Sequence, residues 1–125
     1  MKSVILILIA FIFSFGSCEK ETELSSNVIK GKVVHRSCAS VVVQVLDEKH
    51  QSIGQSEWQQ SASKPTYRHV FSVGNKCAFP NLAEGAEFYF KVISEDPTNR
   101  DCVTCALFDN PPTKVHLVQV VNKPN

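Results

Sequence analysis

Residues 86–93, AEFYFKVI, have the clearest β-strand pattern in the sequence. Every second residue from Ala86 to Val92 is apolar and shares one face, whereas Glu87 belongs to the other face. An alternation of period two is typical of a strand that has one face on a hydrophobic core and the other in solvent. This stretch therefore predicts a β domain, and the segments around it indicate which kind.

Strand patterns also occur on both sides of this stretch, with polar breaks between them. Gly31 predicts a bulge or bend inside the first strand, because glycine weakens a regular strand. The polar segment 47–66 is long for a connection in a small domain, and residues 55–60 within it fit either a short edge strand or a helical turn. The other predicted strands are 28–34, 41–46, 67–73 and 115–121.

Five or six strands without a clear helix predict an all-β fold. Closing these strands into a small antiparallel barrel of five to six strands removes the open edges that promote aggregation. The order of strands and turns resembles the OB-fold, and residues 81–88 (NLAEGAEF) carry most of this resemblance. A small immunoglobulin-like β-sandwich is the alternative architecture.

The N-terminus has the three parts of a secretory signal. Lys2 provides a positive start, residues 4–13 (VILILIAFIF) are an unbroken apolar run, and residues 14–17 (SFGS) are mostly small. The apolar run is shorter than the roughly 20 residues that a helix needs to span a bilayer. We therefore expect residues 1–17 to be a signal peptide that is removed on export.

The residues Gly16-Ser17-Cys18 resemble a bacterial lipobox, although Phe15 stands where that motif usually has leucine. The resemblance implies that Cys18 becomes the lipidated N-terminus and anchors the protein in a membrane, where two or more acyl chains hold stably. An ordinary cleavage site with an incidental cysteine is the alternative. The predicted parts are the lipidated cysteine and flexible tether at 18–27, the β domain at 28–121 and a tail at 122–125.

The acidic run 19–23 (EKETE) is similar to the export signal that sends some Gram-negative lipoproteins to the outer face of the outer membrane. A solvated linker is the simpler interpretation, and both can hold together. The chain thus resembles the small exported bacterial lipoproteins of uncharacterised function. This resemblance implies an exported protein that is lipid-anchored to the outer membrane, on either its periplasmic or its outward face, and it implies no activity.

The balance of charges argues against a nucleic-acid partner. The sequence has 13 basic and 12 acidic residues, and removal of the signal peptide takes away Lys2 and leaves a net charge of about zero. The sequence has no basic cluster long enough to provide the electrostatic footprint that phosphate backbones require. We expect contact with a membrane through the N-terminal lipid, a glycan or protein partner, and no nucleic acid.

Four cysteines remain when Cys18 is set aside, and an even number in an exported chain predicts two disulfides. Three pairings are possible. The short spacing of Cys102 and Cys105 permits a local bridge, which leaves Cys38 to pair with Cys77. We therefore favour Cys38–Cys77 with Cys102–Cys105, whereas the two rival pairings tie the Cys102/Cys105 segment to the other two cysteines.

The sequence contains no motif for a nucleotide, a catalytic serine or a metal ion, so we predict no catalytic residue, metal ligand or cofactor. The four histidines are scattered, and a hydrogen-bonded or exposed position on a sheet suits them better than a ligand role. Trp58, Tyr67 and Tyr89 are the candidates for a ligand-binding face, because exposed aromatic side chains on an OB-like barrel stack on bases or sugars. The simpler role for Trp58 is to cap the end of the barrel.

The favoured function is a non-catalytic binding or accessory module of an exported lipoprotein. Cys102-Val103-Thr104-Cys105 also has the C-x-x-C spacing of thiol–disulfide oxidoreductases, although no βαβ unit accompanies it. An exported thiol–disulfide enzyme that uses Cys102 and Cys105 is therefore one alternative, and a structural envelope protein is another. A zinc site would need paired cysteine knuckles, whereas Cys38 and Cys77 are each solitary.

Overall fold

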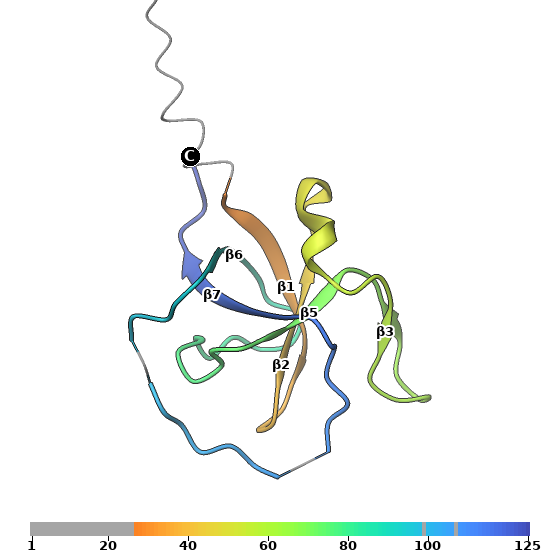
Figure 1. Ribbon diagram of the computed structural model, residues 1–125. Helices are drawn as coiled ribbons and strands as arrows, with labels where there is room; N and C mark the ends of the chain where they lie inside the picture. Colours follow the sequence, from red (N-terminus) through yellow and green to blue (C-terminus); the bar gives the residue numbers. More distant parts are fainter. Residues whose placement is uncertain (1–26, 99, 107) are drawn as a thin grey trace, which may run out of the picture.

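Five strands close into a barrel in the computed structural model, in the order β1-β2-β5-β7-β6 (Figure 1). The structure describes residues 27–98, 100–106 and 108–125. The predicted signal peptide 1–17, the lipidated Cys18 and the tether as far as residue 26 lie outside the described residues. The barrel strands are β1 (Ile29–Arg36), β2 (Val41–Val45), β5 (Val70–Val73), β6 (Glu87–Ile93) and β7 (Val115–Val121).

The closed barrel confirms the predicted small all-β fold, and its strands form one barrel instead of the two packed sheets of a sandwich. Neighbouring barrel strands run antiparallel except where β5 meets β7 and Ser72 pairs with Val115 in parallel. The antiparallel pairing predicted for the barrel therefore holds at every junction but this one. An odd number of strands cannot alternate in direction all the way round a closed barrel, so one junction has to be parallel. The result is the five-stranded Greek-key arrangement of an OB-like barrel.

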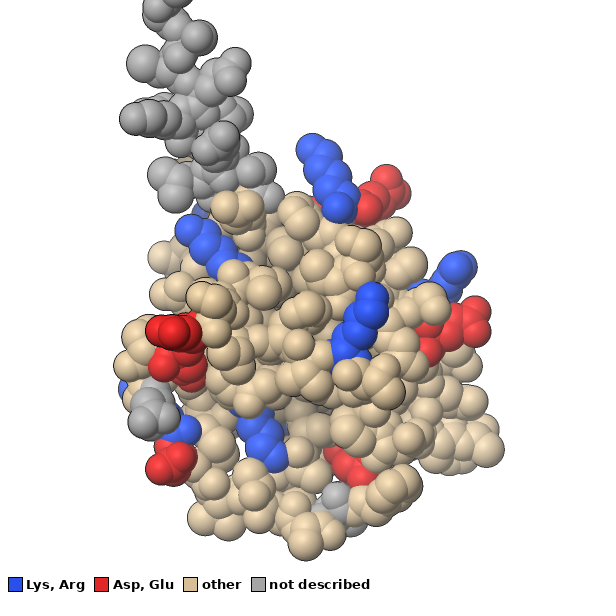
Figure 2. Space-filling view, in the orientation of Figure 1, with Lys and Arg blue, Asp and Glu red and all other residues tan. Residues whose placement is uncertain are grey.

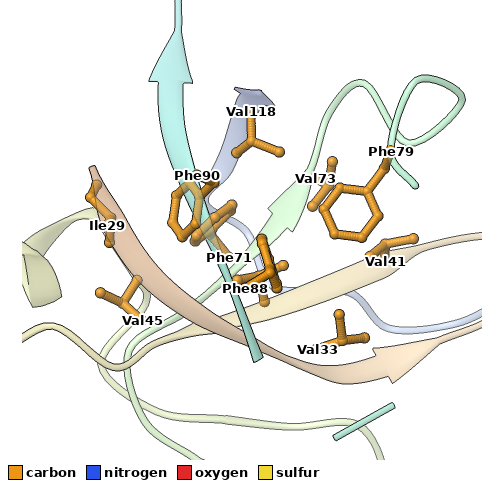
Figure 3. Close-up of a cluster of buried hydrophobic side chains, with 11 residues drawn as sticks. Ile29, Val33, Val41, Val45, Phe71, Val73, Phe79, Phe88, Phe90 and Val118 are labelled. Carbon is orange, nitrogen blue, oxygen red and sulfur yellow. The ribbon is translucent and has the colours of Figure 1, made fainter. Parts of the chain in front are cut away.

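Aromatic and β-branched side chains fill the barrel interior (Figure 3). Phe71 and Phe90 are fully buried, and their ring centroids are 5.6 Å apart. A Cβ on Gly31 would come within 2.8 Å of Phe90 and 2.9 Å of Val43, so this position needs the smallest residue for reasons of space. The interior cluster comprises Ile29, Val33, Val41, Val43, Val45, Phe71, Val73, Phe79, Phe88, Phe90 and Val118.

A second, smaller apolar cluster lies on the outer wall of the barrel. The register between β1 and β2 shifts between Val33 and His35, which marks a β-bulge at Val34. The bulge predicted at Gly31 is therefore wrong by three positions. The extra residue places Val34 in the outer cluster and sets His35 opposite Val42. This outer cluster comprises Val34, Val42, Trp58 and Val70, with Tyr67 partly buried against it.

The long polar segment after β2 contains short elements. A 3-10 helix, η1 (Glu48–Ile53), comes first, and then β3 (Trp58–Gln59) pairs with β4 (Thr66–Tyr67) as a two-stranded hairpin. The edge strand that was one of the two alternatives for this segment is confirmed in β3. The predicted strand 67–73 is divided between β4 and β5, because His69 adopts a φ of 59° in the left-handed region.

The two ends of the barrel differ in what they carry. β1 begins at the end where the C-terminus also lies, and the turn between β1 and β2 lies at the opposite end with the long connection from β6 to β7 (Figure 1). We call residues 37–40 the β1–β2 turn, residues 74–80 the connector, and the described residues of 100–112 the strap. No helix within the described ranges is long and apolar enough to cross a membrane. Basic and acidic side chains are interspersed on the face that Figure 2 shows.

Candidate functional site

Two disulfides hold the strap to the barrel. Cys38 in the β1–β2 turn is bonded to Cys105, and Cys77 in the connector is bonded to Cys102. The Cα–Cα distances are 5.6 Å and 5.3 Å. The predicted pairing of Cys38–Cys77 with Cys102–Cys105 is therefore wrong, and one of the rival pairings is present.

The course of the strap explains why Cys102 and Cys105 bond to different partners. The backbone between Cys102 and Cys105 makes no turn or bend, and three extended residues span about 10 Å. A disulfide requires Cα atoms within about 7 Å of each other, so an extended segment brings its two cysteines to different partners. The C-x-x-C pair does not form a local bridge, and the alternative of a thiol–disulfide enzyme gains no support from this geometry.

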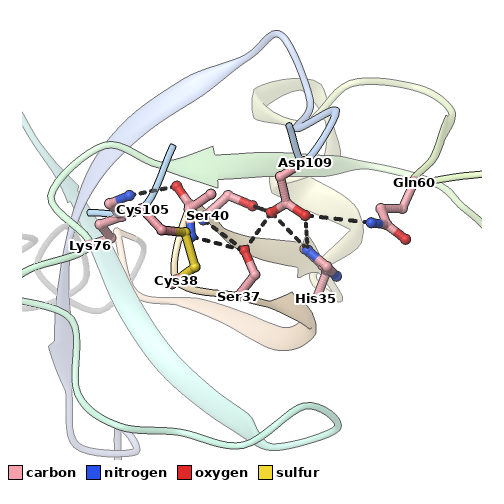
Figure 4. Close-up of a disulfide and its surroundings, with 9 residues drawn as sticks. His35, Ser37, Cys38, Ser40, Gln60, Lys76, Cys105 and Asp109 are labelled. Atoms are coloured by element: carbon pink, nitrogen blue, oxygen red, sulfur yellow. Dashed lines mark hydrogen bonds and ion pairs between the residues drawn. A yellow bond between two sulfur atoms is a disulfide. The ribbon is translucent and has the colours of Figure 1, made fainter. Parts of the chain in front are cut away.

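Asp109 fixes the far end of the strap (Figure 4). Its carboxylate is buried, with 5% of the residue exposed, and it accepts hydrogen bonds from the hydroxyl groups of Ser37, at 2.6 Å, and Ser40. His35 Nε2 lies 2.9 Å from Oδ2, and Gln60 Nε2 lies 3.4 Å from Oδ1. Donors from β1, the β1–β2 turn and the end of β3 thus converge on one carboxylate, and we call this arrangement the Asp109 clamp.

Opposing effects set the pKa of Asp109. Burial of the carboxyl acts to raise the pKa, but the hydrogen bonds from Ser37, Ser40 and His35 outweigh it, so the pKa lies below the ordinary value for aspartate. The group is therefore an ionised acceptor at neutral pH. It follows that His35 Nε2 is the protonated ring nitrogen and donates a hydrogen bond to the carboxylate.

The Asp109 clamp has the residue types of a serine–histidine–aspartate triad, but its contacts follow a different order. In a triad the serine hydroxyl donates to the histidine, which then removes the proton. In this protein the hydroxyl groups of Ser37 and Ser40 donate directly to Asp109, as His35 does. The arrangement therefore holds the strap against β1 and the β1–β2 turn, and its order of contacts is not that of a triad.

The next residue, Asn110, joins the strap to the β3–β4 hairpin. Its backbone carbonyl accepts a hydrogen bond from Trp58 Nε1 at 2.8 Å, and its side-chain amide donates to the carbonyl oxygens of Gln59 and Gln60 at 3.3 Å and 3.2 Å. Asn110 has a φ of 44°, in the left-handed region that asparagine adopts more readily than most residues. The strap and the hairpin consequently form a continuous wall.

A cleft of about 130 Å³ opens between the hairpin and the end of β1. The rings of Trp58 and Tyr67 are stacked with centroids 6.3 Å apart, and the His35 ring lies 6.0 Å from the Trp58 ring. The Glu84 side chain accepts a hydrogen bond from the backbone N–H of Arg36 at 2.9 Å, and Oε1 lies 3.8 Å from His35 Nδ1. The cleft is lined by Val34, His35, Trp58, Gln60, Lys64, Pro65, Tyr67 and Glu84.

Two of the three aromatic residues that the sequence suggested meet in this cleft. Trp58 and Tyr67 both line it, but Trp58 is only 6% exposed, because it packs into the outer cluster. Trp58 covers the wall of the barrel and not its end, so the predicted capping role is wrong. Tyr89 lies on β6 opposite Lys30 of β1 and takes no part in the cleft.

Sequence reasoning missed the polar residues of the site. His35 and Asp109 are 74 positions apart, and nothing in the sequence around Asp109 separates it from an ordinary turn acid. The hydrogen-bonded role predicted in general for the histidines agrees with the contact of His35. The one available signal was the β1–β2 turn, where Ser37 and Ser40 flank Cys38, because pairing with Cys105 brings Asp109 toward these hydroxyl groups.

A larger hollow of about 390 Å³ lies beside β7 and the connector. Asn75 is one of its polar residues, and its side chain already exchanges hydrogen bonds with the backbone of Val118 at 2.8 Å and 2.9 Å. Asp96 likewise accepts from Thr98. The smaller cleft is the better candidate for recognising a ligand, because it combines two stacked aromatic rings with polar side chains. Across the described residues, no three His, Cys, Asp or Glu side chains are grouped to hold a metal ion.

Neither a protein-family model nor a curated protein matches this chain. The fold and the geometry of the cleft therefore carry the functional argument. The two disulfides are consistent with an exported, non-cytoplasmic protein, since such bridges persist in oxidising compartments.

Proposed function

We propose that the protein is an exported, lipid-anchored binding module whose cleft takes a single sugar ring of an envelope or extracellular glycan. The module acts without catalysis and holds its ligand as an accessory component of the cell surface. The observation that carries this proposal is the cleft itself, which combines the stacked rings of Trp58 and Tyr67 with polar side chains on rigid elements.

The chemistry of the cleft suits a sugar. A sugar ring offers both apolar C–H surface and hydroxyl groups, so its site needs an apolar wall and a few placed polar groups. Tyr67 supplies half-buried aromatic surface, Lys64 and Gln60 supply donors, and Glu84, with a side chain 57% exposed, supplies an acceptor. The volume of about 130 Å³ is below the roughly 300–1,000 Å³ of pockets that enclose larger ligands, which favours one ring over a whole oligosaccharide.

The position of the cleft suits display away from a membrane. The start of β1 and the strap lie at opposite ends of the barrel (Figure 1). An anchor at Cys18, followed by a tether that leads into β1, would bring the N-terminal end of the barrel toward the lipid. The Asp109 clamp and the cleft beside it would then face outward.

The rigidity of the site suits binding rather than turnover. The walls of the cleft are fixed by the hydrogen bonds of Asn110 to the hairpin and by the Asp109 clamp. A site that is already ordered loses little conformational entropy when its ligand binds. The hydroxyl groups of Ser37 and Ser40 donate to Asp109 in this clamp, which is why we assign them no nucleophilic role.

Titration with saccharides tests the proposal directly, because Trp58 is the sole tryptophan of the chain and lines the cleft. The full chain in nonionic detergent is mixed with a panel of monosaccharides and envelope oligosaccharides while tryptophan emission is recorded. We expect at least one saccharide to shift the emission in a saturable way. A panel in which every saccharide leaves the emission unchanged would rule out sugar binding at this cleft.

A pair of tyrosine variants provides the control. Tyr67→Ala removes aromatic surface from the cleft and should weaken binding about tenfold or more. Tyr89→Ala removes the same side chain from β6, outside the cleft, and should bind as wild type. Equal affinity of the two variants would place the ligand elsewhere on the barrel.

Palmitate labelling tests the anchor separately. Cells that produce the wild-type chain should incorporate labelled palmitate into it, and cells that produce Cys18→Ala should not. Equal incorporation in both would end the proposal that Cys18 carries the lipid, and it would leave the sugar-binding test unaffected.

A further inference from the structure

The two disulfides stand on either side of one dipeptide of the strap, Val103-Thr104. Cys102 directly before it is bonded to Cys77 in the connector, and Cys105 directly after it is bonded to Cys38 in the β1–β2 turn. Each side of the Val103–Thr104 peptide bond is therefore covalently attached to a different part of the barrel.

The two attachment segments are held close to each other. Lys76 of the connector donates through Nζ to the carbonyl oxygen of Ala39 at 2.5 Å (Figure 4), and the backbone N–H of Ser37 closes the turn by donating to Ser40 O at 2.9 Å. The barrel thus sets the separation of the two disulfides, and the strap between them has a fixed span.

The dipeptide is displayed to solvent. Val103 is 96% exposed, and Phe108 further along the strap is 89% exposed. The backbone of residues 100–106 makes no turn or bend, and it forms no hydrogen bond with any other described residue. Its N–H and C=O groups are therefore available to pair with the backbone of a partner.

We propose that the strap is a substrate-like inhibitory segment for an endopeptidase, with Val103–Thr104 as the bond presented for cleavage. An extended peptide binds a partner through its backbone hydrogen bonds, and pockets for individual side chains provide specificity. Val103 would fill the primary specificity pocket, which indicates an enzyme that accepts small aliphatic side chains. The strap segment 102–106 is uncharged, so its transfer into such a cleft desolvates no ion. This surface is distinct from the sugar cleft and does not depend on it.

The disulfides explain why such a segment would inhibit and not simply be digested. Cleavage adds one water across the amide and leaves a carboxylate on Val103 and an amine on Thr104. In a free peptide these two ends diffuse apart. Here the Cys77–Cys102 and Cys38–Cys105 bonds keep both ends on the barrel at a high effective concentration. The reverse step, which expels the same water and restores the amide, therefore competes with release, and the enzyme stays occupied.

The fixed span of the strap also favours affinity. A segment that is already extended and attached at both sides loses little conformational entropy when it enters the cleft of an enzyme. Complexes of proteases with such pre-ordered inhibitors are among the tightest of their interface size.

Inhibition assays with three serine endopeptidases test the proposal. The full, disulfide-bonded chain in nonionic detergent is assayed against pancreatic elastase, trypsin and chymotrypsin. We expect inhibition of elastase, whose pocket takes small aliphatic side chains. The variant Val103→Arg should lose about 100-fold or more of this inhibition and gain inhibition of trypsin. The matched control is Val115→Arg, at an exposed valine outside the strap, which should keep the wild-type pattern.

Electrophoresis distinguishes inhibition from digestion. A chain cut at Val103–Thr104 should run as one species without reductant and as two after reduction. The double variant Cys77→Ser/Cys102→Ser releases one side of the bond and should change the chain from an inhibitor into a substrate. The proposal is overturned if the wild-type chain inhibits none of the three enzymes, if elastase turns it over steadily, or if Val103→Arg is merely digested by trypsin.

Discussion

Trp58 Nε1 donates a hydrogen bond to the backbone carbonyl of Asn110, 52 residues further along the chain, at 2.8 Å. This contact joins the β3–β4 hairpin to the strap, immediately after the Asp109 clamp joins the strap to β1 and the β1–β2 turn. The wall of the cleft and the attachment of the strap are therefore coupled, and a change in one contact should alter the other.

Replacement of Asn110 tests this coupling. Asn110→Ala loses the hydrogen bonds to Gln59 and Gln60 and places a less tolerant residue at a φ of 44°. We expect the free energy of unfolding to fall by about 1–3 kcal/mol. Asn110→Gly loses the same hydrogen bonds but adopts this φ without strain, so it should be less destabilised. Urea unfolding followed by Trp58 emission measures both variants, and a wild-type midpoint for Asn110→Ala would contradict the coupling.

Asp109 should control part of the acid sensitivity of the protein. Its pKa is depressed in the folded state, so the unfolded chain, with an ordinary value of about 3.9, binds the proton more tightly. The stabilisation is fully present above about pH 4 and is lost as the pH falls through the folded-state pKa. Asp109→Asn should cost about 2–4 kcal/mol at pH 7, because it disrupts a buried hydrogen-bond network. The difference in the free energy of unfolding between wild type and Asp109→Asn should then become smaller below pH 4.

Unfolding in urea at a series of pH values measures this difference in the free energy of unfolding. Asp101→Asn is the control, since Asp101 is an exposed aspartate of the same strap. A gap between wild type and Asp109→Asn that stays constant from neutral to strongly acidic pH would show that the carboxylate is not the group responsible.

The disulfides should supply much of the stability of this small domain. Cys38–Cys105 and Cys77–Cys102 join residues 67 and 25 positions apart, and loops of these lengths contribute about 3–4.5 kcal/mol each in the chain-entropy model. We expect Cys38→Ser/Cys105→Ser to lower the unfolding midpoint strongly while the barrel strands persist at low temperature. Non-reducing peptide mapping of the wild-type chain checks the pairing, and a Cys102–Cys105 peptide would show that the strap takes a different course.

Gly31 should be intolerant of any side chain. The Cβ of Gly31→Ala would meet buried atoms of Phe90 and Val43 at 2.8 Å and 2.9 Å, and overpacking of this kind typically costs about 1–3 kcal/mol. Lys32→Ala, the neighbouring change on the same strand, is the control, because Lys32 does not belong to the interior cluster. Thermal unfolding should separate the two variants, and equal melting temperatures would mean that the interior relaxes freely around the new methyl group.

The architecture was predictable because strand periodicity is a local signal. Residues 86–93 alternate strictly, and β6 occupies nearly all of them. The division of 67–73 was missed, because a positive φ is uncommon even for histidine and the residues around His69 give no further sign of it. The bulge at Val34 was missed for a similar reason. The bulge depends on the register between β1 and β2 and not on the type of residue. Gly31 is a glycine for another reason, because neighbouring side chains leave no room for a Cβ at this position.

The site was only half predictable because its members come together through long-range contacts. Aromatic residues in a polar segment were a usable signal, and they led to Trp58 and Tyr67. Tyr89 is also aromatic, but it lies on β6 and takes no part in the cleft. Asp109 and His35 depend on the route of the strap, which follows from the disulfides. A local bridge between Cys102 and Cys105 was the simplest choice from spacing alone, and it is incompatible with an extended backbone.

The two disulfides are nested, since Cys77 and Cys102 both fall between Cys38 and Cys105 in the sequence. Once the inner bridge has closed its 25-residue span, the shortest path between the outer thiols shrinks from 67 residues to about 40. Oxidation of the inner pair thus prepares the outer pair, and the maturing chain gains a preferred sequence of bond formation without a rearrangement step. An oxidase that works from the N-terminus toward the C-terminus would instead join Cys38 to Cys77 first, and only that order of oxidation would require an isomerase to rearrange the bond.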